Sequence, residues 1–155
     1  MALKPLPRLA VLISGHGSNL QALIEACQAG TVAANLALVL SNRAQAYGLQ
    51  RAERAGIPIV VLDHADYPSR QAFDAALDAC LRAHSIEVVC LAGFMRLLTP
   101  AFVQGWAGRL LNIHPSLLPA YKGLHTHARV LADGAPLTGA TVHYVAREMD
   151  AGPII

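Results

Sequence analysis

Residues 110–119 read LLNIHPSLLP, which combines the pattern of a buried strand with two polar side chains at its end. Side chains alternate between the two faces of a strand, so we expect Asn112 and His114 to point to one face and Ile113 to the other. Open α/β sheets bind ligands at the carboxyl ends of their strands. An amide and an imidazole in that place could hold and polarise a carbonyl group, although polar residues that merely meet water would give the same pattern.

Apolar runs of strand length alternate with helix-period segments over the whole chain, which is typical of βαβ units. Strands are predicted at 9–13, 36–40, 59–62, 88–92, 110–114 and 141–145. Ser69 is the expected N-cap of one helix, Pro100 the first residue of another, and a further helix is expected over 129–132. We therefore predict an α/β fold with an open, mostly parallel sheet and helices on both faces.

Composition excludes several classes of protein. The chain has 155 residues, of which 54% are hydrophobic and 14% charged, and this predicts one folded domain over 1–155 with a flexible N-terminal extension at 1–8. A net charge of +2 argues against nucleic acid or a membrane surface as a partner. The N-terminus lacks a secretory signal and no apolar run approaches the roughly 20 residues of a membrane span, so we expect a cytoplasmic protein.

The three cysteines, Cys27, Cys80 and Cys90, lie far apart within apolar patterns. Their odd number and spacing indicate small core residues in a reducing compartment rather than a disulfide or metal framework.

A glycine-containing segment, Ser14-Gly15-His16-Gly17-Ser18-Asn19-Leu20, joins the first predicted strand to the first helix. Glycines allow close backbone approach, and the unpaired N–H groups of a helix start favour an anion such as phosphate. Ser18 or Asn19 could also cap the helix. The segment matches neither the P-loop nor the complete dinucleotide fingerprint, and a tight turn alone would also use two glycines.

Asp150 follows the last predicted strand and could meet His114, where its carboxylate would favour the charged imidazole. An aspartate in a turn more often binds its own backbone. His143 lies within an apolar strand pattern and is expected to be a satisfied core histidine. His125 and His127 form a weak metal pattern, so positioning or helix-capping roles are favoured and no metal is predicted.

Two arginines are candidates for an anionic or planar ligand. Arg70 lies in the first turn of its helix, where the helix dipole disfavours a cation, although a solvated surface arginine would also fit. Arg96 follows a predicted strand end and could face the cleft.

Together these stretches resemble the glycinamide ribonucleotide formyltransferases, the folate-dependent enzymes of purine synthesis. The matching stretches occur in the family's order: 11–20, 41–44, 91–96, 112–119, 123–127 and 150–153. The resemblance implies a Rossmann-like formyltransferase fold, with glycinamide ribonucleotide and 10-formyltetrahydrofolate as small-molecule substrates, no metal, and a monomer or homodimer.

The resemblance also implies the site residues. Gly17, Ser18 and Asn19 would bind the substrate phosphate, and Asn112, His114 and Asp150 would form the catalytic group. The folate site would comprise Arg70, Met95, Arg96, Leu97, Leu98, Asn112, Ala146, Arg147, Glu148, Met149 and Asp150. In the implied reaction Asn112 and protonated His114 stabilise the oxyanion, and Asp150 keeps His114 charged and assists proton transfer.

The chain departs from the family at His16, where many relatives carry Asn or another small polar residue, and it stops after Ile155, where family members continue. We therefore expect the C-terminal end of the fold to be missing. A 10-formyltetrahydrofolate hydrolase and a non-catalytic phosphate- or folate-binding module are the alternatives, and a methionyl-tRNA formyltransferase fits less well.

Overall fold

The computed structural model describes residues 2–155 and contains one six-stranded sheet in the order β3-β2-β1-β4-β5-β6. The strands are β1 (Arg8–Ile13), β2 (Asn35–Ser41), β3 (Ile59–Val61), β4 (Val88–Leu91), β5 (Leu110–His114) and β6 (Thr141–Tyr144). The helices are α1 (Ser18–Gln28), α2 (Gly48–Arg54), the 3-10 helix η1 (His64–Asp66), α3 (Arg70–Ala83), α4 (Pro100–Gly105) and α5 (Thr126–Ala132). Within residues 2–155, no helix has the length and apolar character needed to span a bilayer.

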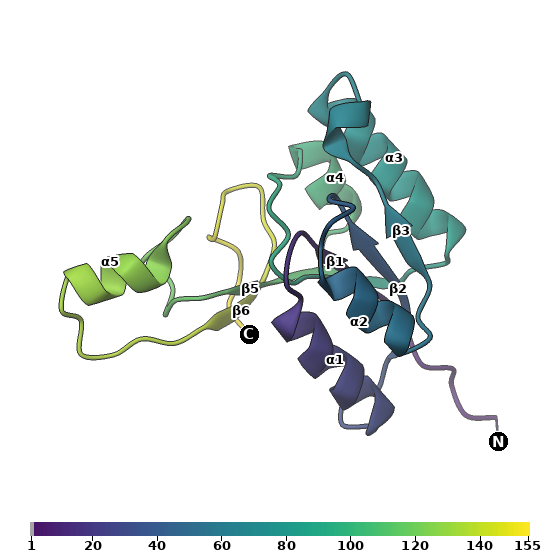
Figure 1. The fold of residues 1–155 in the computed structure, drawn as a ribbon, viewed down its shortest axis with the longest axis horizontal. Coiled ribbons are helices and arrows are strands. Elements are labelled where there is room, and N and C mark those ends of the chain that lie inside the picture. Colours follow the sequence, from purple (N-terminus) through teal and green to yellow (C-terminus); the bar gives the residue numbers. More distant parts are fainter. Residues whose placement is uncertain (1) are drawn as a thin grey trace.

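The sheet is parallel from β1 to β5, and β6 pairs with β5 in the antiparallel direction. Helices α1 and α2 pack one face of the sheet through a cluster that includes Leu20, Ile24 and Leu49, whereas α3 and α4 pack the other through a cluster that includes Phe73 and Trp106 (Figure 1). The predicted α/β fold is confirmed. Strand β6 begins beside the carboxyl end of β5, where Thr141 pairs with His114, and runs back to Tyr144 beside Leu111.

Helix starts follow the predicted capping chemistry in two cases and depart from it in a third. The Ser69 side chain accepts a hydrogen bond from the Ala72 N–H, and Thr99 accepts one from the Phe102 N–H with Pro100 at the first helical position. The prediction that Ser18 or Asn19 caps α1 is wrong. Gly17 is the N-cap, in the left-handed conformation (φ 79°), so Ser18 and Asn19 lie inside the first turn.

The starts of β1 and α5 differ from the predicted ones. Arg8 was expected in the N-terminal extension but begins β1, because its N–H meets the Glu87 carboxylate and its Nε donates to the His84 carbonyl. The first residue of that extension, Met1, lies outside the described residues. Helix α5 begins at Thr126, three residues before its predicted start at 129. The chain after Gly152 runs beside β6, with a bridge between His143 and Ile154.

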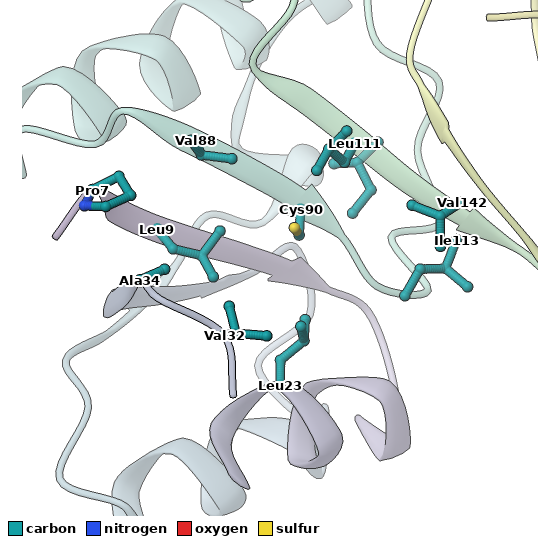
Figure 2. A pocket seen from close by; sticks show the side chains of 11 residues that line it. Pro7, Leu9, Leu23, Val32, Ala34, Val88, Cys90, Leu111, Ile113 and Val142 are labelled. Carbon is teal, nitrogen blue, oxygen red and sulfur yellow. The ribbon is translucent and has the colours of Figure 1, made fainter. Parts of the chain in front are cut away.

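One face of the sheet carries an apolar pocket of about 270 Å³ over β1, β4, β5 and β6. Figure 2 shows Leu111, Ile113 and Val142 directed into it, together with Leu9 and Cys90. Alternation along β5 places Asn112 and His114 on the opposite face. The pocket is therefore separate from the polar strand end.

The three cysteines are free thiols in partly buried positions, which agrees with their predicted core role. Burial raises the pKa of the Cys90 thiol to about 11, with a smaller contribution from Cys27, and burial also raises the pKa values of Cys27 and Cys80. The thiolate, which is the reactive form, is therefore scarcest at Cys90 near neutral pH.

Replacement of Ser69 by Ala removes the N-cap hydrogen bond of α3 and should lower the free energy of unfolding by about 1 kcal/mol. Urea unfolding of Ser69→Ala measures this loss. Gln71→Ala, an exposed change in the same first turn, is the control. Equal losses in the two variants would contradict the capping role.

Alkylation should distinguish the cysteines. In the folded protein at about pH 8, iodoacetamide should modify Cys90 more slowly than Cys27 or Cys80, because its thiol is the most strongly protonated. The rate at Cys90 should rise as the pH approaches about 11. Mass spectrometry of the alkylated peptides gives the three rates, and modification of Cys90 as fast as the others would count against this assignment.

Candidate active site

The carboxyl ends of three strands meet at Ser14, which follows β1. Its hydroxyl donates to the Asn42 Oδ1 atom at 2.6 Å and accepts from the Met95 N–H at 2.7 Å. Ser14 and Asn42 are both buried, so the hydrogen bonds connect the ends of β1, β2 and β4 without solvent between them. The sequence placed Asn42 only within a family stretch. The position of its side chain depends on the sheet order, which the sequence does not state.

The glycine-containing segment after Ser14 packs against the start of α2. The Gly48 N–H donates to the Gly15 carbonyl at 3.0 Å. A Cβ atom on Gly17 would lie 2.7 Å from the Gly48 Cα atom, so this contact and the positive φ both require glycine. Within the residues that the structure describes, the N–H groups of Gly17, Ser18 and Asn19 have no hydrogen-bond acceptor. Such groups at the start of an eleven-residue helix favour an anion.

A second polar group lies at the end of β5, where the structure brings together Asn112, His114 and Asp150. The His114 Nδ1 atom lies 3.5 Å from Asp150 Oδ2, and both side chains are more than nine-tenths buried. Asp150 Oδ2 also accepts the Gly123 N–H at 2.8 Å. His114 and Asp150 thus lie together, as the family resemblance implied, and their catalytic roles stay a prediction.

His143 is the member of this group that sequence reasoning missed. It is buried, and its Nε2 atom lies 3.2 Å from Asn112 Nδ2 and 3.9 Å from Asp150 Oδ1. Its Nδ1 donates to the Tyr144 carbonyl at 3.0 Å, so in the neutral ring Nε2 is an acceptor for the Asn112 amide. The pairing of β5 with β6 would have revealed His143, because Asn112 and His143 are direct partners in it. The sequence did not predict that these two strands are antiparallel.

Both ring nitrogens of His114 face acceptors. Nδ1 faces the Asp150 carboxylate, and Nε2 lies 2.7 Å from the Tyr121 carbonyl. A neutral imidazole carries a single N–H, so only the doubly protonated ring donates to both acceptors. The Tyr121 carbonyl occupies the hydrogen-bonding position at His114 Nε2, so a ligand can bind that atom only after the carbonyl has moved away.

The backbone around this group is conformationally unusual. Among non-glycine residues of 2–155, positive φ angles occur at Ser85, Tyr121, His125 and Asp150. Three of the four lie in the two segments that surround His114. Strained conformations of this kind concentrate at functional sites, where neighbouring contacts hold them.

The residues implied for the folate site lie in two separate segments. Arg70 donates to the Leu97 carbonyl at 3.3 Å, which places it beside the 95–98 segment. Met95 and Leu97 are exposed and Leu98 is buried. The second segment, 146–149, joins β6 to Asp150 and exposes Arg147, Glu148 and Met149, with Ala146 half-buried. No hydrogen bond or ion pair of residues 2–155 connects the two segments.

Arg96 points inward from the first of these segments. Its guanidinium lies 4.5 Å from the centre of the Phe73 ring, and its buried Nε atom has no hydrogen-bond partner among the described residues. That Arg96 faces a ligand stays a prediction. The unpaired Nε supports it, because a buried donor without a partner costs free energy.

His125 and His127 do not form a metal site or a cap. His125 is the N-cap residue of α5 but makes no side-chain capping bond, so that suggested role is wrong, and His127 is exposed. Within residues 2–155, no group of three or more His, Cys, Asp or Glu side chains is placed to hold a metal ion.

Comparison with known proteins identifies relatives for this arrangement. A family model described as formyl transferase matches residues 7–155. The phosphoribosylglycinamide formyltransferase of Escherichia coli K12 is 51% identical over 147 residues, which are 95% of this chain and 69% of that protein. The trifunctional purine biosynthetic protein adenosine-3 of Gallus gallus is 55% identical over 148 residues, but the match covers only 15% of its length.

The solved structures that resemble this chain include enzymes of the same family. The glycinamide ribonucleotide transformylase 1 of Symbiobacterium toebii superposes with a TM-score of 0.96 at 48% identity, covering 99% of this chain and 72% of that one. The chain thus spans about a seventh of the trifunctional relatives and about seven-tenths of the single-enzyme relatives.

Gly152 should not tolerate a side chain, because an added Cβ would lie 1.7 Å from the Tyr144 carbonyl oxygen and 3.2 Å from the Ala146 N atom. Both are backbone atoms of the segment that leads to Asp150. Gly152→Ala should lower the free energy of unfolding by about 3 kcal/mol, as overpacking of a buried position does.

Urea unfolding measures this loss, with Gly105→Ala as the control, since the nearest atom to a Cβ on Gly105 is an Arg82 Nη at 3.9 Å. A loss no larger than that of the control would show that this turn can rearrange freely.

Proposed function

Because the chain belongs to the phosphoribosylglycinamide formyltransferase family, we propose that it transfers the formyl group of 10-formyltetrahydrofolate to the amine of glycinamide ribonucleotide. Residues 1–155 would act as one formyltransferase domain in the cytoplasm, on two small-molecule substrates, as a monomer or a homodimer. The observation that carries the proposal is the group of Asn112, His114 and Asp150 at the end of β5, in which the His114 and Asp150 side chains are buried. It provides donors for a carbonyl oxygen and a carboxylate for proton transfer in one place.

The reaction begins when the neutral amine of the acceptor attacks the formyl carbon. A carbon–nitrogen bond forms, and the carbonyl oxygen gains negative charge in the tetrahedral intermediate. The bond from that carbon to the folate nitrogen then breaks, and the carbonyl reforms. One proton leaves the amine and one reaches the folate nitrogen, so that formylated glycinamide ribonucleotide and tetrahydrofolate are the products.

Asn112 and His114 would stabilise the oxygen as it gains charge. His143 accepts one N–H of the Asn112 amide and leaves the second for the substrate. Protonated His114 would supply the other donor once the Tyr121 carbonyl has left Nε2. Well-placed donors of this kind contribute about 3–4 kcal/mol each.

Asp150 would have two tasks. Its carboxylate, 3.5 Å from His114 Nδ1, would accept the Nδ1–H and orient the ring, and with a bound water it would pass the proton from the amine to the folate nitrogen. Its bond to the Gly123 N–H keeps it at the site.

The remaining residues would hold the two substrates. Gly17, Ser18 and Asn19 would bind the phosphate through their unpaired N–H groups. The segments 95–98 and 146–150, together with Arg70, would bind the folate. Holding both reactants in one cleft contributes a proximity effect that neither segment gives alone.

The test is release of tetrahydrofolate from 10-formyltetrahydrofolate with and without glycinamide ribonucleotide. The proposal predicts release only when the amine is present. Equal release without it would indicate a hydrolase, and no release in either case would favour a binding module.

His114→Ala and Asp150→Asn should each reduce kcat by about 100-fold or more, because each change removes a donor or the carboxylate that positions it. Binding of glycinamide ribonucleotide should stay within about twofold, since the phosphate end of the site is distant in sequence and made by backbone groups. Turnover assays and isothermal titration give the two quantities.

His64→Ala and Asp66→Asn, exposed changes in η1, are the matched controls. Loss of substrate binding in the His114 and Asp150 variants would reassign both residues to a structural role.

A further inference from the structure

A cluster of two rings and one guanidinium lies beside the glycine-containing segment. The His16 and Tyr47 rings stack at 5.2 Å with an interplanar angle of 23°, and the Arg51 guanidinium lies 5.0 Å from the centre of the Tyr47 ring. We propose that Arg51 is a positioning residue for segment 15–19 and thereby determines the affinity for the phosphate of the acceptor. This inference rests on the proposed function, which assigns no role to Arg51.

The first argument is the hydrogen bonding. Arg51 Nε donates to the His16 carbonyl at 2.9 Å, and an Nη atom lies 3.0 Å from His16 Nδ1. Arginine presents its donors in a rigid planar arrangement, so two contacts to one residue fix that residue's orientation. Arg51 thus holds both the main chain and the side chain of His16.

The second argument is the geometry of the peptide that follows. The His16 carbonyl and the Gly17 N–H belong to the same planar trans peptide and point in opposite directions. The bond that keeps the His16 carbonyl toward α2 therefore turns the Gly17 N–H away from α2. Gly17 N–H is the first of the three unpaired N–H groups, so its direction decides whether it joins the Ser18 and Asn19 N–H groups on one anion.

The third argument is the charge. Within residues 2–155, no carboxylate lies within ion-pair distance of Arg51. Its positive charge is therefore left uncompensated next to a segment that would bind a phosphate dianion. The last turn of α2 also suits a cation, because the helix dipole is negative there, and this is the alternative that the experiment must separate.

Arg54 provides the matched control for that alternative. It lies in the same last turn, 5.7 Å from the centre of the same Tyr47 ring, and donates to the Tyr47 hydroxyl at 3.0 Å. Unlike Arg51, it makes no hydrogen bond to segment 15–19. Arg51→Gln and Arg54→Gln therefore share the loss of a helix-end cation and an aromatic contact and differ in the contact to His16.

The experiment measures steady-state kinetics and direct binding of inorganic phosphate. Arg51→Gln should raise KM for glycinamide ribonucleotide about tenfold and weaken phosphate binding about tenfold, as loss of a charged hydrogen bond does. Both kcat and KM for 10-formyltetrahydrofolate should stay within about twofold. Arg51→Lys keeps the charge but not both hydrogen bonds, so its KM for glycinamide ribonucleotide and its phosphate affinity should lie between those of the wild type and of Arg51→Gln. Arg54→Gln should match the wild type in both quantities.

The outcomes separate this inference from the proposed function. If the wild type transfers formyl groups but Arg51→Gln and Arg54→Gln bind phosphate equally, the role of Arg51 is refuted and the function stands. If the wild type shows no transfer, yet only the Arg51 variants lose phosphate binding, the function fails and the role stands. Absence of phosphate binding in the wild type would overturn the role, and Arg51→Lys replaces Arg51→Gln if the latter does not fold.

Discussion

The Asp150 carboxylate is the interaction on which the candidate active site depends. It is buried, accepts the Gly123 N–H at 2.8 Å and lies within 4 Å of two histidines, His114 on β5 and His143 on β6. A carboxylate in that position is stable only if it is paired, and its pairing joins three parts of the chain. The polar group at the strand end is thus a small network in which Asp150 lies between the two histidines and His143 in turn contacts Asn112.

The fold provides that position through β6. Because β6 runs antiparallel to β5, the chain leaves it beside Leu110 and Leu111. The segment that follows returns Asp150 to His114, and Gly152 lets its turn lie directly against the Tyr144 carbonyl. The parallel part of the sheet positions the other half of the site, which is the glycine-containing segment after β1. There Ser14 connects the ends of β1, β2 and β4, and the following glycine segment is held by α2. The two halves meet along the β4–β5 edge, where Leu91 pairs with Asn112.

Much of this arrangement could be predicted from the sequence, because it rests on local patterns. The strand at 110–114 and the N-cap Ser69 follow from periodicity and capping chemistry. The meeting of His114 with Asp150 was implied only by the resemblance to a known family. What could not be predicted depends on register and packing between distant segments. His143 has the pattern of a core residue and joins the site only through its pairing with Asn112. Likewise, nothing local to α2 indicates that Arg51 holds His16.

The central claim is that the Asp150 carboxylate holds His114 and the segment around Gly123 in place at the end of β5. A crystal structure of Asp150→Ala, compared with one of the wild type, measures this most directly. The account predicts that the His114 ring and the Gly123 N–H both move from their wild-type positions, since each loses its contact with the carboxylate. Unchanged positions of His114 and Gly123 in the variant would contradict it.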